Sequence, residues 1–179
     1  MKQKHIISIA ACVLMTTLLF TGCADMTNAK VSSQEEIDSC KSIIEEFATN
    51  NEYDLEFSKK KLLEDTAIEG EILLDKERGW LNFYIKEDGV VNLHLFVRDK
   101  SHLEDYLDDI ISLSNTLSKR QFTLAEIKEF LESDEYLKTE DTDYIYKHKY
   151  YGWWSDSSVS YSQRGDTASV DLATGFPRW

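Results

Sequence analysis

Short stretches of alternating hydrophobic and polar residues fill the middle of the chain. They cover residues 67–74, 80–86 and 90–98, with Glu77-Arg78-Gly79 and Glu87-Asp88-Gly89 between them. Turn residues with glycine between short alternating runs are typical of β-hairpins. These residues are therefore predicted to form a three-stranded antiparallel meander. In the third strand the alternation separates two sets of side chains: Val91, Leu93, Leu95 and Val97 on one side, and Val90, Asn92, His94 and Phe96 on the other.

The last third of the chain shows the same pattern. Residues 144–151, 157–162 and 167–174 are predicted strands, separated by Gly152-Trp153-Trp154-Ser155 and by residues 163–166. Arg164-Gly165-Asp166 matches a short integrin-binding tripeptide, but a glycine flanked by polar residues is also what a hairpin tip needs. We interpret it as a turn.

Three segments have hydrophobic residues at helical spacing, each after a capping-box pattern. Residues 34–49 follow Ser33-x-x-Glu36, residues 102–113 follow Ser101-x-x-Glu104, and residues 124–132 follow Thr123-x-x-Glu126. Residues 102–117 could equally belong to a strand, and alternation near Tyr53 allows a short strand there. Strands grouped around helices, without regular βαβ order, indicate an α+β fold. The prediction is one domain, residues 34–179, with an antiparallel sheet of hairpins packed with two or three helices.

A different pattern occupies the N-terminus. Lys2 and Lys4 precede an uncharged run over residues 6–20 that is too short to span a membrane, which needs about 20 apolar residues. A basic start, an apolar middle and small residues at the end are typical of a secretory signal. The run ends in Leu19-Phe20-Thr21-Gly22-Cys23, which resembles the lipobox of bacterial lipoproteins, although that family usually carries Leu, Val or Ile where Phe20 stands.

The resemblance implies cleavage before Cys23 and diacylglycerol on the Cys23 sulfur. Residues 1–22 are then a lipoprotein signal peptide and residues 23–33 a lipidated tether. Two acyl chains anchor a protein stably, whereas one does so only marginally. The expected location is the outer side of the cell membrane, lipid-anchored. The alternatives are an ordinary cleaved signal with an incidental cysteine, or an uncleaved short anchor.

Charge narrows the choice of partners. The chain has 20 Lys and Arg against 33 Asp and Glu, a net charge of −13, which becomes −15 once Lys2 and Lys4 leave with the signal. Nucleic-acid binding requires basic residues that neutralise phosphates, so nucleic acid is not expected as a partner. An acidic protein favours a basic protein partner and is repelled by anionic lipid.

The sequence contains few motifs that indicate catalysis or metal binding. No phosphate-binding loop, His-Glu-x-x-His or Gly-x-Ser-x-Gly pattern is present, and His94, His102 and His148 show no metal-ligand spacing. The acidic clusters at residues 104–109 and 132–143 lack the glycine and spacing of a calcium loop. We therefore expect no catalytic residue, metal or cofactor. Cys40 falls in helical register with Ile44 and is predicted to pack in the core.

Aromatic residues gather in the last 36 residues. On an extended strand Tyr144, Tyr146, His148 and Tyr150 share one face, while Ile145, Lys147, Lys149 and Tyr151 share the other. Tyrosine and tryptophan are favoured at recognition surfaces. The alternatives are mainly core packing or a partner-binding surface, for which the candidates are Tyr151, Trp153, Trp154 and Tyr161.

The leading functional interpretation is a non-enzymatic binding protein that contacts another macromolecule outside the cytoplasm. In layout, with an anchored precursor, a small acidic domain, hairpins and helices, the chain resembles the TipC-type membrane-anchored immunity proteins. That resemblance implies inhibition of a secreted toxin by covering a basic active-site rim, and it carries over no site residue. The alternatives are a glycan- or solute-binding lipoprotein that uses the aromatics for stacking, and an envelope structural lipoprotein.

Overall fold

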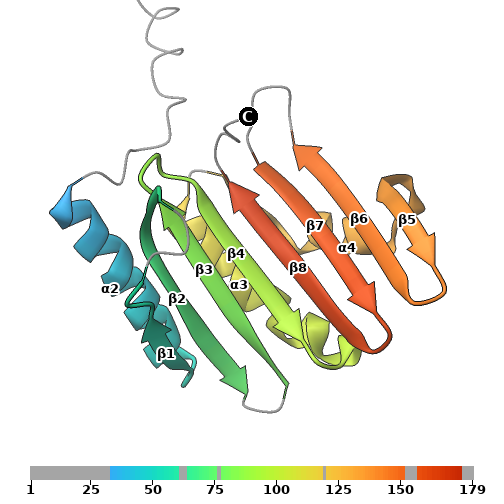
Figure 1. Ribbon diagram of the computed structural model, residues 1–179, viewed down its shortest axis with the longest axis horizontal. Helices are drawn as coiled ribbons and strands as arrows, with labels where there is room; N and C mark the ends of the chain where they lie inside the picture. The colour runs from blue at the N-terminus through green and yellow to red at the C-terminus, as the bar shows by residue number, and fades with distance from the viewer. Residues whose placement is uncertain (1–32, 61–63, 76–77, 119, 152–156, 175–179) are drawn as a thin grey trace, which may run out of the picture.

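A single antiparallel sheet organises the protein. The computed structural model describes residues 33–60, 64–75, 78–118, 120–151 and 157–174. The sheet has eight strands in the order β1-β2-β3-β4-β8-β7-β6-β5 (Figure 1). The strands are β1 (Asp54–Phe57), β2 (Thr66–Asp75), β3 (Gly79–Lys86), β4 (Val91–Val97), β5 (Leu137–Asp141), β6 (Tyr144–Tyr151), β7 (Ser157–Arg164) and β8 (Thr167–Thr174).

Helices lie against one face of this sheet only, among the described residues. They are α2 (Gln34–Asn50), α3 (Leu103–Leu117) and α4 (Leu124–Glu132). In Figure 1 the sheet faces the viewer, and α3 and α4 pass behind it. The α+β prediction is confirmed. The sheet therefore has a covered face, which contacts the helices, and an open face.

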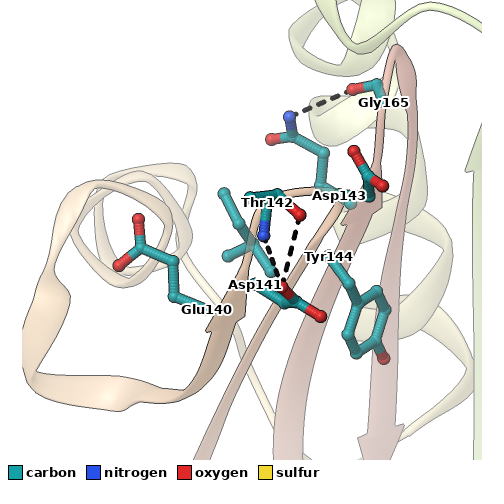
Figure 2. Close-up of a pocket in the computed structure, with 8 residues that line it drawn as sticks. Glu140, Asp141, Thr142, Asp143, Tyr144 and Gly165 are labelled. Carbon is teal, nitrogen blue, oxygen red and sulfur yellow. Dashed lines mark hydrogen bonds between the residues drawn. The ribbon is translucent and has the colours of Figure 1, made fainter.

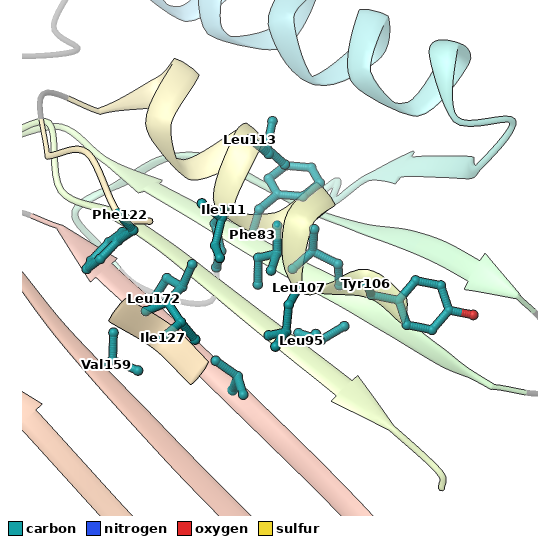
Figure 3. Packing of buried hydrophobic residues seen from close by; sticks show 14 of the residues in the cluster. Phe83, Leu95, Tyr106, Leu107, Ile111, Leu113, Phe122, Ile127, Val159 and Leu172 are labelled. Atoms are coloured by element: carbon teal, nitrogen blue, oxygen red, sulfur yellow. The ribbon is translucent and has the colours of Figure 1, made fainter. Parts of the chain in front are cut away.

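The hydrophobic core lies between the helices and the covered face. Alternate residues of β3 and β4 point into it, as predicted, and β8 contributes in the same way. Figure 3 shows Phe83 and Leu95 of the sheet packed with Leu107 and Ile111 of α3. The side chains of Phe83 and Leu107 are fully buried. Cys40 packs against this core, which confirms its predicted place.

Two of the three predicted capping boxes are present. Ser33 and Glu36 exchange side-chain and backbone hydrogen bonds at the start of α2, and Thr123 and Glu126 do so at α4. The box at Ser101 is wrong. Asp99 accepts from the Ser101 backbone and begins a short 3-10 turn, Lys100–His102, and α3 starts after it without a side-chain cap. The Ser101 backbone N–H donates to Asp99, so it does not bond to the Glu104 side chain as the predicted box requires.

Residues 103–117 are helical, which decides the alternative left open for this segment. Strand β5 was not predicted, and its residues Leu137-Lys-Thr-Glu-Asp are almost all exposed. An edge strand with one hydrophobic residue has no alternation that a sequence pattern can detect. The turn interpretation of Arg164-Gly165-Asp166 is confirmed, because Gly165 has a φ of 59° at the β7–β8 hairpin tip.

Candidate functional site

The open face carries ordered rows of polar and aromatic side chains. In an antiparallel sheet, residues opposite one another in register point to the same side, so the strand pairings define these rows. The central row runs across seven strands: Glu56, Glu71, Asn82, His94, Asp171, Ser160 and His148. One flanking row is Asp54, Leu73, Trp80, Phe96, Ser169, Ser162, Tyr146 and Thr139. The other is Glu69, Tyr84, Asn92, Ala173, Ser158 and Tyr150.

Asp171 is the hub of a hydrogen-bonded network in the central row. Its Oδ1 lies 2.6 Å from His94 Nδ1, and its Oδ2 accepts from Ser160 Oγ at 2.9 Å. On the next strand Tyr146 and His148 are joined by a 2.8 Å hydrogen bond between the hydroxyl and Nδ1. Tyr146 also interacts with Ser160. Side chains from β4, β8, β7 and β6 are thus connected across the sheet.

Asn82, in the same row, connects Glu71 to an aromatic pair. With its amide nitrogen turned toward Glu71, Asn82 donates to Glu71 Oε2 at 3.1 Å and accepts from Trp80 Nε1 at 3.3 Å. The Trp80 and Phe96 rings stack with centroids 4.2 Å apart. A second aromatic group lies on β6, where the rings of His148 and Tyr150 are 4.3 Å apart. The open face therefore has aromatic groups on both sides of Asp171.

The hydrogen bonds of this network do not arrange Ser160 as an activated nucleophile. An activated serine requires a base that takes its proton, usually histidine. Ser160 instead donates to Asp171, and His94 contacts the other oxygen of that carboxylate. Within the described ranges, no group of three or more His, Cys, Asp or Glu could hold a metal ion.

The first acidic cluster has structural partners. Asp109 accepts a 2.6 Å hydrogen bond from the Tyr53 hydroxyl, which ties the segment after α2 to α3. Glu104 pairs with Lys128 of α4 at 2.8 Å. These contacts agree with a helix surface rather than an ion site.

A hollow of about 590 Å³ lies at the β5–β6 turn, where the second acidic cluster ends (Figure 2). Glu140, Asp141 and Asp143 line it together with Tyr144. Its hydrogen bonds are local: the Thr142 backbone and hydroxyl donate to Asp141, and the Gln163 amide donates to the Gly165 carbonyl. The hollow is acidic and open, and these hydrogen bonds hold the β5–β6 and β7–β8 turns beside it.

The predicted partner-binding residues lie apart from the open face or outside the described residues. Tyr151 is buried on the covered face, where its ring contacts Phe122 edge-on. Tyr161 is half-buried on the same face and packs against the core. Trp153, Trp154 and Cys23 lie outside the residues that the structure describes. Their roles in partner binding and lipidation stay predictions.

Sequence reasoning placed Tyr144, Tyr146, His148 and Tyr150 on one face but missed Ser160 and Asp171. Tyr144 is 41% exposed and Tyr150 is 60% exposed, so this face of β6 is the accessible one. A signal for the missed residues exists, because polar residues alternate with buried ones in β7 and β8. Their meeting with His94 depends on the pairing of β8 with β4.

The two histidines of the central row have opposite pKa shifts. The hydrogen bond to Asp171 raises the pKa of His94 against the effect of burial. Burial lowers the pKa of His148, and Lys138 acts in the same direction. A raised histidine pKa adds stability below the unfolded-state pKa, and this stability is lost as the pH rises through the folded-state pKa.

We therefore expect His94→Gln to cost more stability at about pH 5 than at about pH 8. His148→Gln should cost less stability at about pH 5 than at about pH 8, because the fold favours neutral His148 and protonation of this residue at low pH already destabilises the wild type. Thermal unfolding of the wild type and both variants at the two pH values measures this. Equal pH dependence in the two variants would contradict the assignment.

In comparisons with known proteins, no family model, curated protein or solved structure matches the chain. No helix in the described part of the chain is long and apolar enough to cross a membrane.

Proposed function

We propose that this protein is a lipid-anchored, non-enzymatic binding protein that holds a basic protein partner against the open face of its sheet, outside the cytoplasm. One observation carries the proposal. Across β3, β4, β8, β7 and β6, the described residues place no element over the open face, yet its side chains are aromatic and hydrogen-bonded rather than simply solvated. Tyrosine and tryptophan on an uncovered face suit macromolecular contact.

The charges favour a basic partner. Glu56 and Glu71 lie directly opposite each other on β1 and β2 and point to the open face. Like charges in opposed positions destabilise a strand pair, so a cation from a partner that approaches both is favourable. The net charge of −13 acts at longer range and speeds association with a positively charged surface.

The aromatic groups would supply the contact area. Tyr150 and Tyr144 are the exposed large hydrophobic side chains of the described residues. Trp80 and Phe96 form the stacked pair on the other side of the network. Rigid aromatic side chains bury large areas at little cost in conformational entropy.

The anchor part of the proposal rests on the N-terminal sequence. The basic start, the short apolar run and the lipobox-like residues before Cys23 support lipidation and cleavage there. A tether of about ten residues keeps the domain close to the membrane. The negative charge of the domain disfavours contact with anionic lipid, so the open face remains accessible to a protein partner.

A specific form of the proposal is an immunity protein. The acidic and aromatic open face would cover the basic rim of a secreted toxin's active site and exclude the substrate. The resemblance in layout to TipC-type proteins, with an anchored precursor and a small acidic domain, supports this form.

The test compares two pairs of charge changes in the full-length protein in membranes of the producing cells. Glu56→Gln with Glu71→Gln removes two charges from the open face. Glu45→Gln with Glu46→Gln removes two from exposed positions of α2 and is the matched control. Proteins secreted by the same and competing cells are captured and identified, and their association rates are measured at increasing salt. A Cys23→Ser copy, expected in the aqueous fraction, tests the anchor.

We expect a basic protein whose association slows on the order of tenfold at low salt in the open-face pair and little in the α2 pair. Its affinity should fall as salt rises. Equal association rates of the partner with the open-face variant and the α2 variant, or binding that does not depend on salt, would contradict the proposal. Thermal stabilisation by sugars or peptidoglycan fragments, without a protein partner, would favour the glycan-binding alternative instead.

A further inference from the structure

We propose that Asp171 is the centre of an arginine-binding subsite on the open face, which receives the guanidinium group of a side chain from the partner. The inference rests on the proposed function and specifies the chemistry of the contact. It concerns the Asp171 carboxylate, its contacts with His94 and Ser160, and the aromatic rings nearby.

The Asp171 carboxylate is held in one orientation before any ligand arrives. His94 Nδ1 lies 2.6 Å from one oxygen, and Ser160 Oγ lies 2.9 Å from the other. A side chain fixed in this way loses little further conformational entropy on binding. An ionised carboxylate has about four acceptor positions. Two are used by His94 and Ser160, and the side chain remains 34% exposed, so a partner can still reach the carboxylate.

Access to Asp171 is not blocked by its neighbours on the open face. The nearest open-face residues of β7 and β8 are all small: Ser158, Ser162, Ser169 and Ala173. The larger side chains come from β4 on one side and β6 on the other. These strands are three strand spacings apart, about 14 Å. A long side chain from a partner can therefore reach the carboxylate between them.

The electrostatic potential around Asp171 favours the binding of a cation. The pKa of Tyr84 is raised by burial and by three carboxylates, Glu69, Glu71 and Asp171. Burial and Asp171 likewise raise the pKa of Tyr146. Two tyrosines on opposite sides of Asp171 thus experience the same negative region. A positive ligand at Asp171 reduces that field.

The rings favour arginine over lysine. A guanidinium group can donate to both oxygens of a carboxylate in its own plane while its flat face stacks on an aromatic ring. Tyr146 interacts with Ser160, the residue that contacts Asp171, and His148 and Tyr150 continue this aromatic surface. A lysine ammonium is a point charge that gains less from the planar surroundings.

The experiment uses three short peptides that differ at one position, acetyl-Gly-X-Gly-amide with X as arginine, lysine or citrulline. Citrulline keeps the shape of arginine without its charge. Each peptide is titrated at constant ionic strength into the full-length protein in detergent, and the NMR signals of His94, Tyr146 and His148 are followed. We expect saturable shifts with a millimolar dissociation constant for arginine, weaker binding for lysine, and none for citrulline.

Two isosteric variants separate the local contact from general attraction. Asp171→Asn removes the charge at the centre, and Glu71→Gln removes an equal charge in the same row on β2, three strand spacings from β8. We expect Asp171→Asn to weaken arginine binding about tenfold or more, and Glu71→Gln to weaken it far less. Tyr146→Leu, which leaves Asp171 intact, should reduce the preference for arginine over lysine.

Equal binding of the arginine and lysine peptides, equal effects of Asp171→Asn and Glu71→Gln, or no saturable shift would overturn the subsite. If a basic partner is captured through the open face and the arginine peptide fails, the proposed function stands and this inference falls. If the peptide binds at Asp171 and no partner depends on the open face, the subsite stands and the proposed function falls.

Discussion

Phe83→Ala is expected to lower the free energy of unfolding by about 3–5 kcal/mol, because it removes a buried ring and leaves a cavity. Phe83 has no exposed surface and meets Phe57 edge-on, with ring centroids 5.7 Å apart. Its ring also lies over Gly70, where a Cβ would collide with both the ring and the Glu56 carbonyl oxygen. The backbone of β2 is therefore fitted to Phe83, and it cannot easily relax into the space. Urea unfolding of the variant measures the loss.

Phe96→Ala is the matched control. Phe96 lies on the neighbouring strand but points to the open face, where it stacks on Trp80 and is only half-buried. Its loss should cost about 1–2 kcal/mol. Equal destabilisation by the two variants would mean that the open face is also a packed interior, and it would count against the division into covered and open faces.

Lys147→Met is expected to lower the free energy of unfolding by about 1.5–3 kcal/mol, the usual cost of losing a hydrogen bond from a charged group. Lys147 is 7% exposed, and its Nζ donates to the Leu131 carbonyl at 2.7 Å. Leu131 lies in the last turn of α4, where carbonyls have no partner within the helix and a cation is favoured. Methionine keeps the apolar stem, so the variant isolates the ammonium group.

Lys149→Met provides the comparison on the same strand face. Lys149 Nζ lies over the rings of Tyr136 and Tyr151, so its loss should cost about 0.5–1 kcal/mol, the value of such cation–π contacts. Chemical unfolding of both variants gives the ranking. An unchanged or higher stability of Lys147→Met would show that the desolvation of the buried ammonium outweighs its contact with α4.

Local patterns were sufficient for most elements. The bounds of β6, β8 and α4 follow directly from alternation, glycine turns and a capping box, because these signals act over a few neighbouring residues. The Ser101 box does not form, because Asp99 binds the Ser101 backbone N–H and caps the short 3-10 turn before α3. The exposed strand β5 has no local signal, since its backbone pairing with β6 rather than its side chains holds it.

The candidate site depended on pairings between distant segments. His94 and Asp171 are 77 residues apart in the chain, and they meet because β8 pairs with β4 and joins the meander to the C-terminal hairpins. Strand pairing over such separations is determined by packing of the whole sheet, which no short sequence window contains. Alternation in β7 and β8 shows only that Ser160 and Asp171 point away from the core.

Sequence alone determined that β6 has two different faces and that residues such as Tyr146 and Lys147 point in opposite directions, because successive side chains of a strand must alternate. Only the tertiary structure decided which face is covered. The helices pack on the face that bears Phe83 and Leu93, because that side carries the continuous hydrophobic surface across β2, β3, β4 and β8. Tyr151 and Lys147 are buried as a consequence, while Tyr150 and the Asp171 network remain on the open side.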